Sequence, residues 1–145
     1  MNYTVEIEIN LPLERVISLF GKADNIRLWQ PDLVSFESVS GTPGEVGAES
    51  KLVYKMGSRE IEMTEVITQK NLPLISAGIY ETDNVWNLVE NSFISLGKDK
   101  TKWISKNEFK CTGFVKMMAM LMPGTFKKQS SQYLQNFKQF AEGLS

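Results

Sequence analysis

Histidine is absent from the 145 residues of the chain, and cysteine occurs once, as Cys111. Without histidine there is no Ser-His or Cys-His nucleophilic pair, and the usual ligand of zinc and non-haem iron is missing. A single cysteine excludes a disulfide bond within the chain. We therefore expect no metal and no cofactor, so any chemistry must use carboxylates, tyrosines, lysines, arginines, amides or the one thiol.

An excess of basic charge and long apolar runs are also missing. The chain has 16 Lys and Arg against 17 Asp and Glu, so nothing indicates a nucleic-acid surface. No run approaches the roughly 20 apolar residues of a membrane-spanning helix. The first residues, Met1–Glu6, lack the basic and apolar segments of a signal peptide. We expect one cytoplasmic domain over residues 1–145, with no nucleic-acid partner and no integral membrane segment.

Alternating apolar and polar residues predict an antiparallel sheet. Every second residue from Tyr3 to Ile9 is apolar or aromatic, which is typical of a strand with one wet face. Similar runs between turn signals predict six further strands. The expected strands cover residues 3–9, 33–40, 49–55, 59–68, 74–82, 85–97 and 101–110. In the last of them Trp103 and Asn107 share a face, which we expect to point inward.

Two short helices are expected between the first and second strands. Pro12 suits the first turn of a helix, and Gly21 suits its end. The second helix covers about residues 24–28 and stops before Pro31, because the residue before proline avoids the helical conformation.

From Phe114 onward the apolar residues follow a helical period. One apolar stripe consists of Phe126, Tyr133, Phe137, Phe140 and Leu144. Pro123 and Gly124 interrupt the pattern, either as a hinge or as a fixed kink along the sheet. The element order predicts an α+β domain in which a curved antiparallel sheet of about seven strands wraps around a long C-terminal helix.

Four local motifs occur in a distinctive order along the chain. They are Trp29-Gln30-Pro31-Asp32, Gly44-Glu45-Val46-Gly47-Ala48, Met63-Thr64-Glu65-Val66-Ile67 and the run from Met117 to Phe140. Together they resemble the START-like, Bet v 1-like or SRPBCC superfamily, which includes polyketide cyclase/dehydrase and lipid-transport proteins. The resemblance covers essentially the whole chain and implies a helix-grip fold with a pocket between sheet and helix. It implies no single function, because this fold hosts carriers, cyclases, chaperone co-factors and ribosome-associated proteins.

Methionine is concentrated in one apolar segment. Met117, Met118 and Leu121 belong to it, and methionine suits adaptable apolar surfaces. We predict that these three residues bind the ligand as a pliable wall or lid of the pocket. The alternatives are ordinary core packing, a contact in a homodimer, or a tip that touches a membrane.

Glu65 is the residue on which chemistry would depend. It shares strand parity with Met63 and Ile67, so an inward face would place its carboxyl group in apolar space. Burial there would raise its pKa and suit it to act as an acid, a base or a ligand anchor. The alternatives are a salt bridge at the edge of the sheet, or a strand twist that turns the side chain to solvent.

Further ligand-binding residues are expected on the strands and the long helix. Asn107 offers both a donor and an acceptor, while Ser130 lies in the helix, where a solvated flank is the alternative. The rest of the predicted lining is Trp29, Tyr54, Met63, Tyr80, Trp103 and Phe126. Trp86 and Phe93 fall on opposite faces of one strand unless a bulge intervenes.

Three functions are compatible with these residues. The leading hypothesis is a non-catalytic protein, monomeric or homodimeric, that binds or transports a small hydrophobic ligand such as a lipid, isoprenoid or polyketide-like molecule. The second is a polyketide cyclase or dehydratase that uses a pocket carboxylate, which the lack of histidine weakens. The third is a protein-interaction module of the chaperone-activator type, which predicts a large exposed apolar patch and little internal volume.

Overall fold

The computed structural model describes residues 1–144 and contains one seven-stranded antiparallel sheet and four α-helices. The strands are β1 (Asn2–Ile9), β2 (Leu33–Ser40), β3 (Glu49–Met56), β4 (Arg59–Asn71), β5 (Ile75–Thr82), β6 (Val85–Gly97) and β7 (Lys100–Cys111). They lie in the order β1-β7-β6-β5-β4-β3-β2, so each strand from β2 onward pairs with the next. The predicted α+β fold class is confirmed, and the observed strands differ from the predicted ones by at most three residues at any end.

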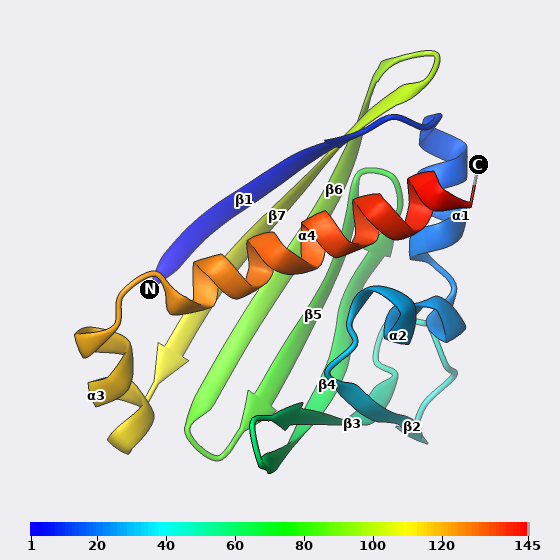
Figure 1. Ribbon diagram of the computed structural model, residues 1–145. Coiled ribbons are helices and arrows are strands. Elements are labelled where there is room, and N and C mark those ends of the chain that lie inside the picture. The colour runs from blue at the N-terminus through cyan, green and yellow to red at the C-terminus, as the bar shows by residue number, and fades with distance from the viewer. Residues whose placement is uncertain (145) are drawn as a thin grey trace.

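Short helices occupy the connection between β1 and β2. They are α1 (Leu13–Phe20), a 3₁₀ turn (Ala23–Asn25) and α2 (Ile26–Trp29). Since β1 and β2 are the two opposite edges of the sheet, this connection must cross its full width, and α1 and α2 lie at one end of the sheet (Figure 1). Pro12 directly precedes α1, as its position in the sequence predicted.

The C-terminal region forms two helices rather than one interrupted helix. Helix α3 (Gly113–Leu121) projects from one corner of the sheet, and α4 (Thr125–Gly143) runs across the concave face (Figure 1). Proline cannot donate the next helical hydrogen bond, and Gly124 has a φ of 90°, which favours glycine. The predicted interruption at Pro123 and Gly124 is therefore confirmed as a break between two helices, and whether it acts as a hinge stays a prediction.

Aromatic packing holds the C-terminal half of α4 against the sheet. Phe137 is fully buried between Leu134 and Ala141 on the inner face of the helix. Around it lies an aromatic cluster with ring centroids 5.0–6.1 Å apart, formed by Phe20, Trp29, Phe93, Trp103 and Phe137. Because these rings come from α1, α2, β6, β7 and α4, one cluster fixes the helices relative to the sheet.

The outer face of β6 is distinct from this core. Phe93 is buried in the aromatic cluster, whereas the ring of Trp86 lies under the Lys110 ammonium, whose Nζ is 4.7 Å from the ring centroid. The pairing of β6 with β7 runs without a register shift from Val85 to Ser95. Trp86 and Phe93 therefore fall on opposite faces, as the alternation predicted.

Truncation of Phe137 tests whether the aromatic cluster stabilises the fold. We expect Phe137→Ala to lower the free energy of unfolding by about 3–5 kcal/mol, because it leaves a cavity in fully buried packing. The neighbouring exposed residue gives the control Gln135→Ala, with an expected change within about 0.5 kcal/mol. Urea denaturation followed by circular dichroism measures both, and equal losses would contradict this role for the cluster.

Candidate ligand-binding site

A cavity of about 770 Å³ lies between the sheet and the N-terminal half of α4. Phe20, Trp29 and Trp103 form its floor on the side of the aromatic cluster. From there it extends along β3 to β7 beneath the α4 residues Phe126 to Leu134. Its volume is in the range of about 300–1,000 Å³ that is common for small-molecule sites. The cavity is therefore the part of the helix–sheet interface that the aromatic cluster does not fill.

Strand alternation determines which side chains line the cavity. On β6 every second residue from Val85 to Asn91 faces it, and the next residue in this series, Phe93, enters the core. On β4 the inward series is Ile61, Met63, Glu65 and Ile67. None of the five ion pairs found among residues 1–144 includes Glu65. The carboxyl group thus points into the cavity, and the salt-bridged and solvent-facing alternatives do not hold.

Nine of the twelve predicted ligand-binding residues line this cavity. They are Trp29, Tyr54, Met63, Glu65, Tyr80, Trp103, Asn107, Phe126 and Ser130. Their contact with a ligand stays a prediction, but the structure brings them around one space.

The other three residues, Met117, Met118 and Leu121, lie outside the cavity lining. Their exposed fractions are 51%, 38% and 70%. The break at Pro123 and Gly124 directs α3 away from the sheet, so these side chains face solvent. The prediction that they form a wall of the pocket was wrong, since Val115 is the residue of α3 that reaches the lining, and their role as a lid stays a prediction.

Sequence reasoning missed several polar residues of the cavity. Asn87 and Asn91 share the inward parity of Phe93 on β6, a signal that could have revealed them. Tyr133 was assigned to the apolar stripe of the long helix, where it packs against the core, and it also lines the cavity. Asp32 also reaches the lining, but it lies after α2 in a segment without strand periodicity, so parity could not have placed it.

Glu65 and three tyrosines form the most distinctive chemical group of the cavity. This Glu65 group consists of Glu65 on β4, Tyr80 on β5, Tyr54 on β3 and Tyr133 on α4. Glu65 and Tyr80 are direct cross-strand neighbours. Burial raises the pKa of the Glu65 carboxyl, while a hydrogen bond with Tyr80 partly opposes that shift. The protonated carboxyl is therefore favoured over a wider pH range than in water.

The tyrosines of this group remain neutral hydrogen-bonding partners. The Tyr54 hydroxyl donates to Gln30 Oε1 at 2.6 Å, and the Gln129 amide donates to the Tyr133 hydroxyl at 3.3 Å. Burial, helped by the negative charge of Asp32, raises the pKa of Tyr133 to about 12. Burial and the nearby Glu65 charge also raise the pKa values of Tyr54 and Tyr80. Side-chain amides thus hold two of the three rings in place.

A second polar group lies along β1, β7 and the start of α4. The Tyr3 hydroxyl is 2.7 Å from Ser130 Oγ and also donates to the carbonyl of Phe126 at 3.1 Å. On β7 the Asn107 amide donates to Ser105 Oγ at 3.2 Å. These bonds link α4 to the sheet across the cavity and position the amide of Asn107 within its wall.

The charged groups of the lining are mainly acidic. Asp32 and Glu65 line the cavity together with one lysine, Lys70. The Lys70 ammonium lies 3.6 Å from a carboxylate oxygen of Glu45, and its side chain is 43% exposed. This lysine is therefore oriented toward the outside, and the Glu65 group has no cationic partner among the lining residues. Residues 1–144 also contain no cluster of side chains suited to hold a metal ion.

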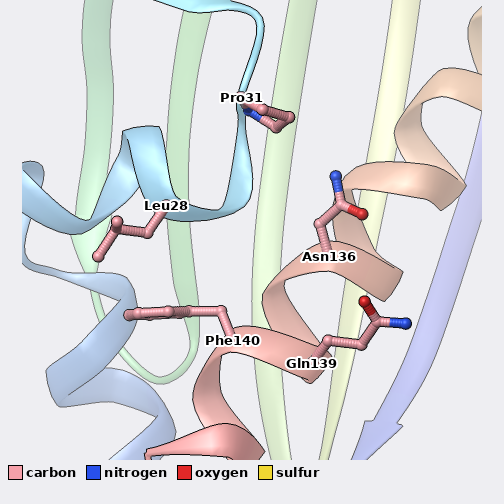
Figure 2. A pocket seen from close by; sticks show the side chains of 5 residues that line it. All are labelled: Leu28, Pro31, Asn136, Gln139 and Phe140. Carbon is pink, nitrogen blue, oxygen red and sulfur yellow. The ribbon is translucent and has the colours of Figure 1, made fainter.

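A smaller hollow of about 450 Å³ lies on the outside, between α2 and α4. It is lined by Leu28, Pro31, Asn136, Gln139 and Phe140. Figure 2 shows Phe140 extending from α4 toward Leu28, with the two amides on neighbouring turns of the helix. None of these side chains is ionisable, whereas the larger cavity is lined by Asp32, Glu65 and Lys70.

Comparison with known proteins gives matches in structure only. No protein-family model matches the sequence, and no curated protein is significantly similar to it. A START superfamily protein from Mycobacterium smegmatis matches with a TM-score of 0.81, 11% identity and 99% coverage of both chains. The Zhui aromatase/cyclase from Streptomyces sp. R1128 has a TM-score of 0.81 and 11% identity, over 98% of this chain and 93% of that one. Norcoclaurine synthase from Thalictrum flavum, in complex with dopamine and hydroxybenzaldehyde, has a TM-score of 0.74 and 14% identity, over 100% and 88%.

A curved antiparallel sheet that holds a long helix over an internal cavity defines the helix-grip class of proteins. Within that class the chain has the START/Bet v 1-like, or SRPBCC, fold, as its sequence motifs predicted. The matched structures include a START superfamily protein and two kinds of enzyme, and identities of 10–15% show the fold alone.

Replacing Glu65 tests the burial of its carboxyl group. The pKa of Glu65 is raised above the usual 4.5, so the wild type loses stability as the pH rises from 4.5 through the folded-state pKa. We therefore expect Glu65→Gln to gain stability relative to the wild type over this range, by about 1.4 kcal/mol for each unit of pKa difference. Urea denaturation at a series of pH values measures the gain.

Two further variants control this experiment. Glu60→Gln removes a carboxyl from the exposed, opposite face of β4, and an equal pH-dependent gain there would show that net charge is responsible. Tyr80→Phe removes the hydrogen bond that lowers the pKa of Glu65. Carbon NMR should then detect the Glu65 titration at higher pH than in the wild type.

Proposed function

We propose that the protein binds or transports a small, neutral, amphipathic molecule in the cavity. The observation that carries this proposal is the cavity of about 770 Å³ itself, which has an apolar wall on the strands and polar groups at defined places. The aromatic cluster already holds α4 at its C-terminal half, so a ligand would enter a largely preformed space. Lipids, isoprenoids and polyketide-like molecules fit this description.

The apolar part of the ligand would supply most of the affinity. Met63, Ile61 and Val89 offer apolar surface from two strands, and Phe126 adds apolar surface from α4. Each methylene group moved from water to such a wall contributes about 0.8 kcal/mol. A chain or ring system of about ten carbons would therefore bind with useful affinity even after the entropic cost of association.

The head of the ligand would be a hydroxyl or a similar hydrogen-bonding group near Glu65. The Glu65 carboxyl and the Tyr80 hydroxyl can each donate or accept there, and Asn107 offers a second polar contact at another wall. An anionic head would be disfavoured, because Asp32 and Glu65 are acidic and Lys70 is paired with Glu45. The cytoplasmic location, the absence of a nucleic-acid partner and the choice between monomer and homodimer stay predictions.

Matched amphiphiles test this function. We expect the neutral dye N-phenyl-1-naphthylamine to bind in the cavity and to fluoresce there. At pH 8, decanol should displace the dye at a concentration at least about tenfold lower than decanoate requires. The two competitors have the same length and differ in the charge of the head. Equal displacement would contradict the head-group assignment, whereas no binding of either the dye or the competitors would contradict the binding function.

Two tryptophan variants of β6 locate the binding site. Val89→Trp fills the cavity from the centre of the sheet and should abolish dye binding. Leu88→Trp places the same ring one residue earlier, on the opposite face of the strand, and should leave dye binding unchanged. Dye binding that persists in Val89→Trp would place the dye outside the cavity.

Acid–base catalysis of the cyclase or dehydratase type is the second candidate, and the pairing of Glu65 with Tyr80 favours it. A carboxyl with a raised pKa beside a hydroxyl that stays neutral can exchange a proton with a bound substrate. The solved aromatase/cyclase and norcoclaurine synthase show that enzymes occur among similar folds. The two candidates share one cavity and differ in whether Glu65 transfers a proton.

The probe 5-nitrobenzisoxazole tests proton transfer by Glu65. Its carbon-bound proton moves to a carboxylate as the N–O bond breaks, and 2-cyano-4-nitrophenolate is released and absorbs visible light. We expect catalysis that rises as Glu65 ionises and falls at least about 100-fold in Glu65→Gln. A rate no faster than that of acetate at equal concentration would contradict the catalytic candidate and leave ligand binding untouched.

A further inference from the structure

Helix α3 exposes almost all of its large apolar side chains. No residue of the helix is buried, and α3 contacts the rest of the described chain mainly at the end of β7. Its large, exposed apolar residues, with the one that follows the helix, define the α3 patch: Phe114, Met117, Met118, Met120, Leu121 and Met122. Met120 is 75% exposed, so the patch faces outward rather than into the fold.

A short helix with so many exposed apolar side chains is unusual on a surface that contacts only water. An isolated helix of nine residues is marginal in water, and a helix that is apolar on all sides is normally buried. Clustered exposed apolar side chains mark a place where a protein meets another surface. The third hypothesis predicted such a patch but also little internal volume, and the cavity of about 770 Å³ does not fit that second expectation.

The charges around the α3 patch indicate what that surface is. The sequence has no Asp or Glu between Glu108 and Glu142, although the whole chain carries a net charge of −1. The same stretch contains the lysines Lys110, Lys116, Lys127, Lys128 and Lys138. One acidic residue nearby is Asp83 in the turn between β5 and β6, where the Asn84 carbonyl accepts a bond from the Thr112 amide just before α3. Lys138 lies near the other end of α4 and pairs with Glu142, so the positive charge beside the α3 patch comes from Lys116 of α3 and from Lys127 and Lys128 at the start of α4.

We propose that the α3 patch binds an anionic lipid bilayer. The methionines and Leu121 would enter the boundary between headgroups and acyl chains, about 5–10 Å deep, while Lys116, Lys127 and Lys128 contact the lipid phosphates. A second copy of the chain is a poorer partner, because face-to-face contact would bring these lysines together. No described helix is long and apolar enough to cross a membrane, and docking at the interface requires none.

This docking would place the cavity next to the bilayer. Val115 of α3 and Phe126 at the start of α4 both line the cavity, so α3 lies at one end of it. Figure 1 shows that end at the corner of the sheet where α3 projects. An apolar ligand could then pass between membrane and cavity with little exposure to water, a consequence that rests on the proposed binding function.

Vesicle flotation with the full chain tests membrane docking. We expect the wild type to float with vesicles of 40% phosphatidylglycerol in phosphatidylcholine and to bind pure phosphatidylcholine at least about tenfold more weakly. Met120→Asp should weaken binding to the anionic vesicles at least about tenfold, whereas Met120→Leu should retain it. Leu74→Asp changes an apolar residue of similar exposure, 71%, in a different region and should bind like the wild type.

A second pair of variants isolates the contribution of charge. Lys127→Gln with Lys128→Gln should weaken binding to anionic vesicles about tenfold, because each lysine near the surface contributes severalfold. Lys55→Gln with Lys98→Gln removes the same net charge from exposed positions elsewhere and should have little effect. Equal losses in both pairs would show that overall charge acts instead of the surface near α3, and would overturn the proposal.

Insertion depth and the alternative partners complete the test. Met120→Trp should show a blue-shifted emission with anionic vesicles and quenching by lipids brominated on the acyl chains. A dimer in solution that Met120→Asp dissociates, or binding to an acidic polypeptide such as polyglutamate without binding to vesicles, would overturn the proposal. Dye binding by Met120→Asp should equal that of the wild type, so failure of membrane docking is distinguishable from failure of ligand binding.

Discussion

The packing of α4 against the sheet through the aromatic cluster is the constraint on which the other features depend. Phe137 and its neighbours fill the interface at one half of the helix, where α1 and α2 also contribute rings. N-terminal to Leu134 the side chains of the same helix do not fill the space above the strands, and a cavity remains. The stability of the fold and the space for a ligand thus occupy different halves of one interface, so a ligand need not compete with the core.

The sequence predicted the sheet well because a two-residue period is a strong signal. Each strand was located, and the inward face of β7 followed correctly from the parity of Trp103 and Asn107. Parity also placed Glu65 with Met63 on one face, but only the structure decided that this face was the inner one. The period identifies which residues share a face, whereas the direction of that face depends on helices that pack from elsewhere in the chain.

The sequence failed to predict side-chain positions where these depend on the direction in which a backbone segment leaves the fold. Pro123 and Gly124 were recognised as an interruption, yet the sequence does not state in which direction α3 leaves. The apolar character of Met117 and Leu121 favoured a buried position, and the exposed orientation overrode that preference. Tyr133 does lie on the inward stripe, but the stripe does not reveal which of its members face a cavity and which face the core.

The edge-to-edge connection between β1 and β2 has a consequence for how the chain folds. β1 pairs with β7, so that Asn2 lies opposite Glu108, and α4 then packs on β1. Contacts between such distant parts of a sequence are slow to form. During synthesis β1 remains without its partner strand until β7 has left the ribosome, near the end of the chain. The hairpins from β2 to β6 can assemble earlier, so the cavity is closed by the first and the last segments of the chain together.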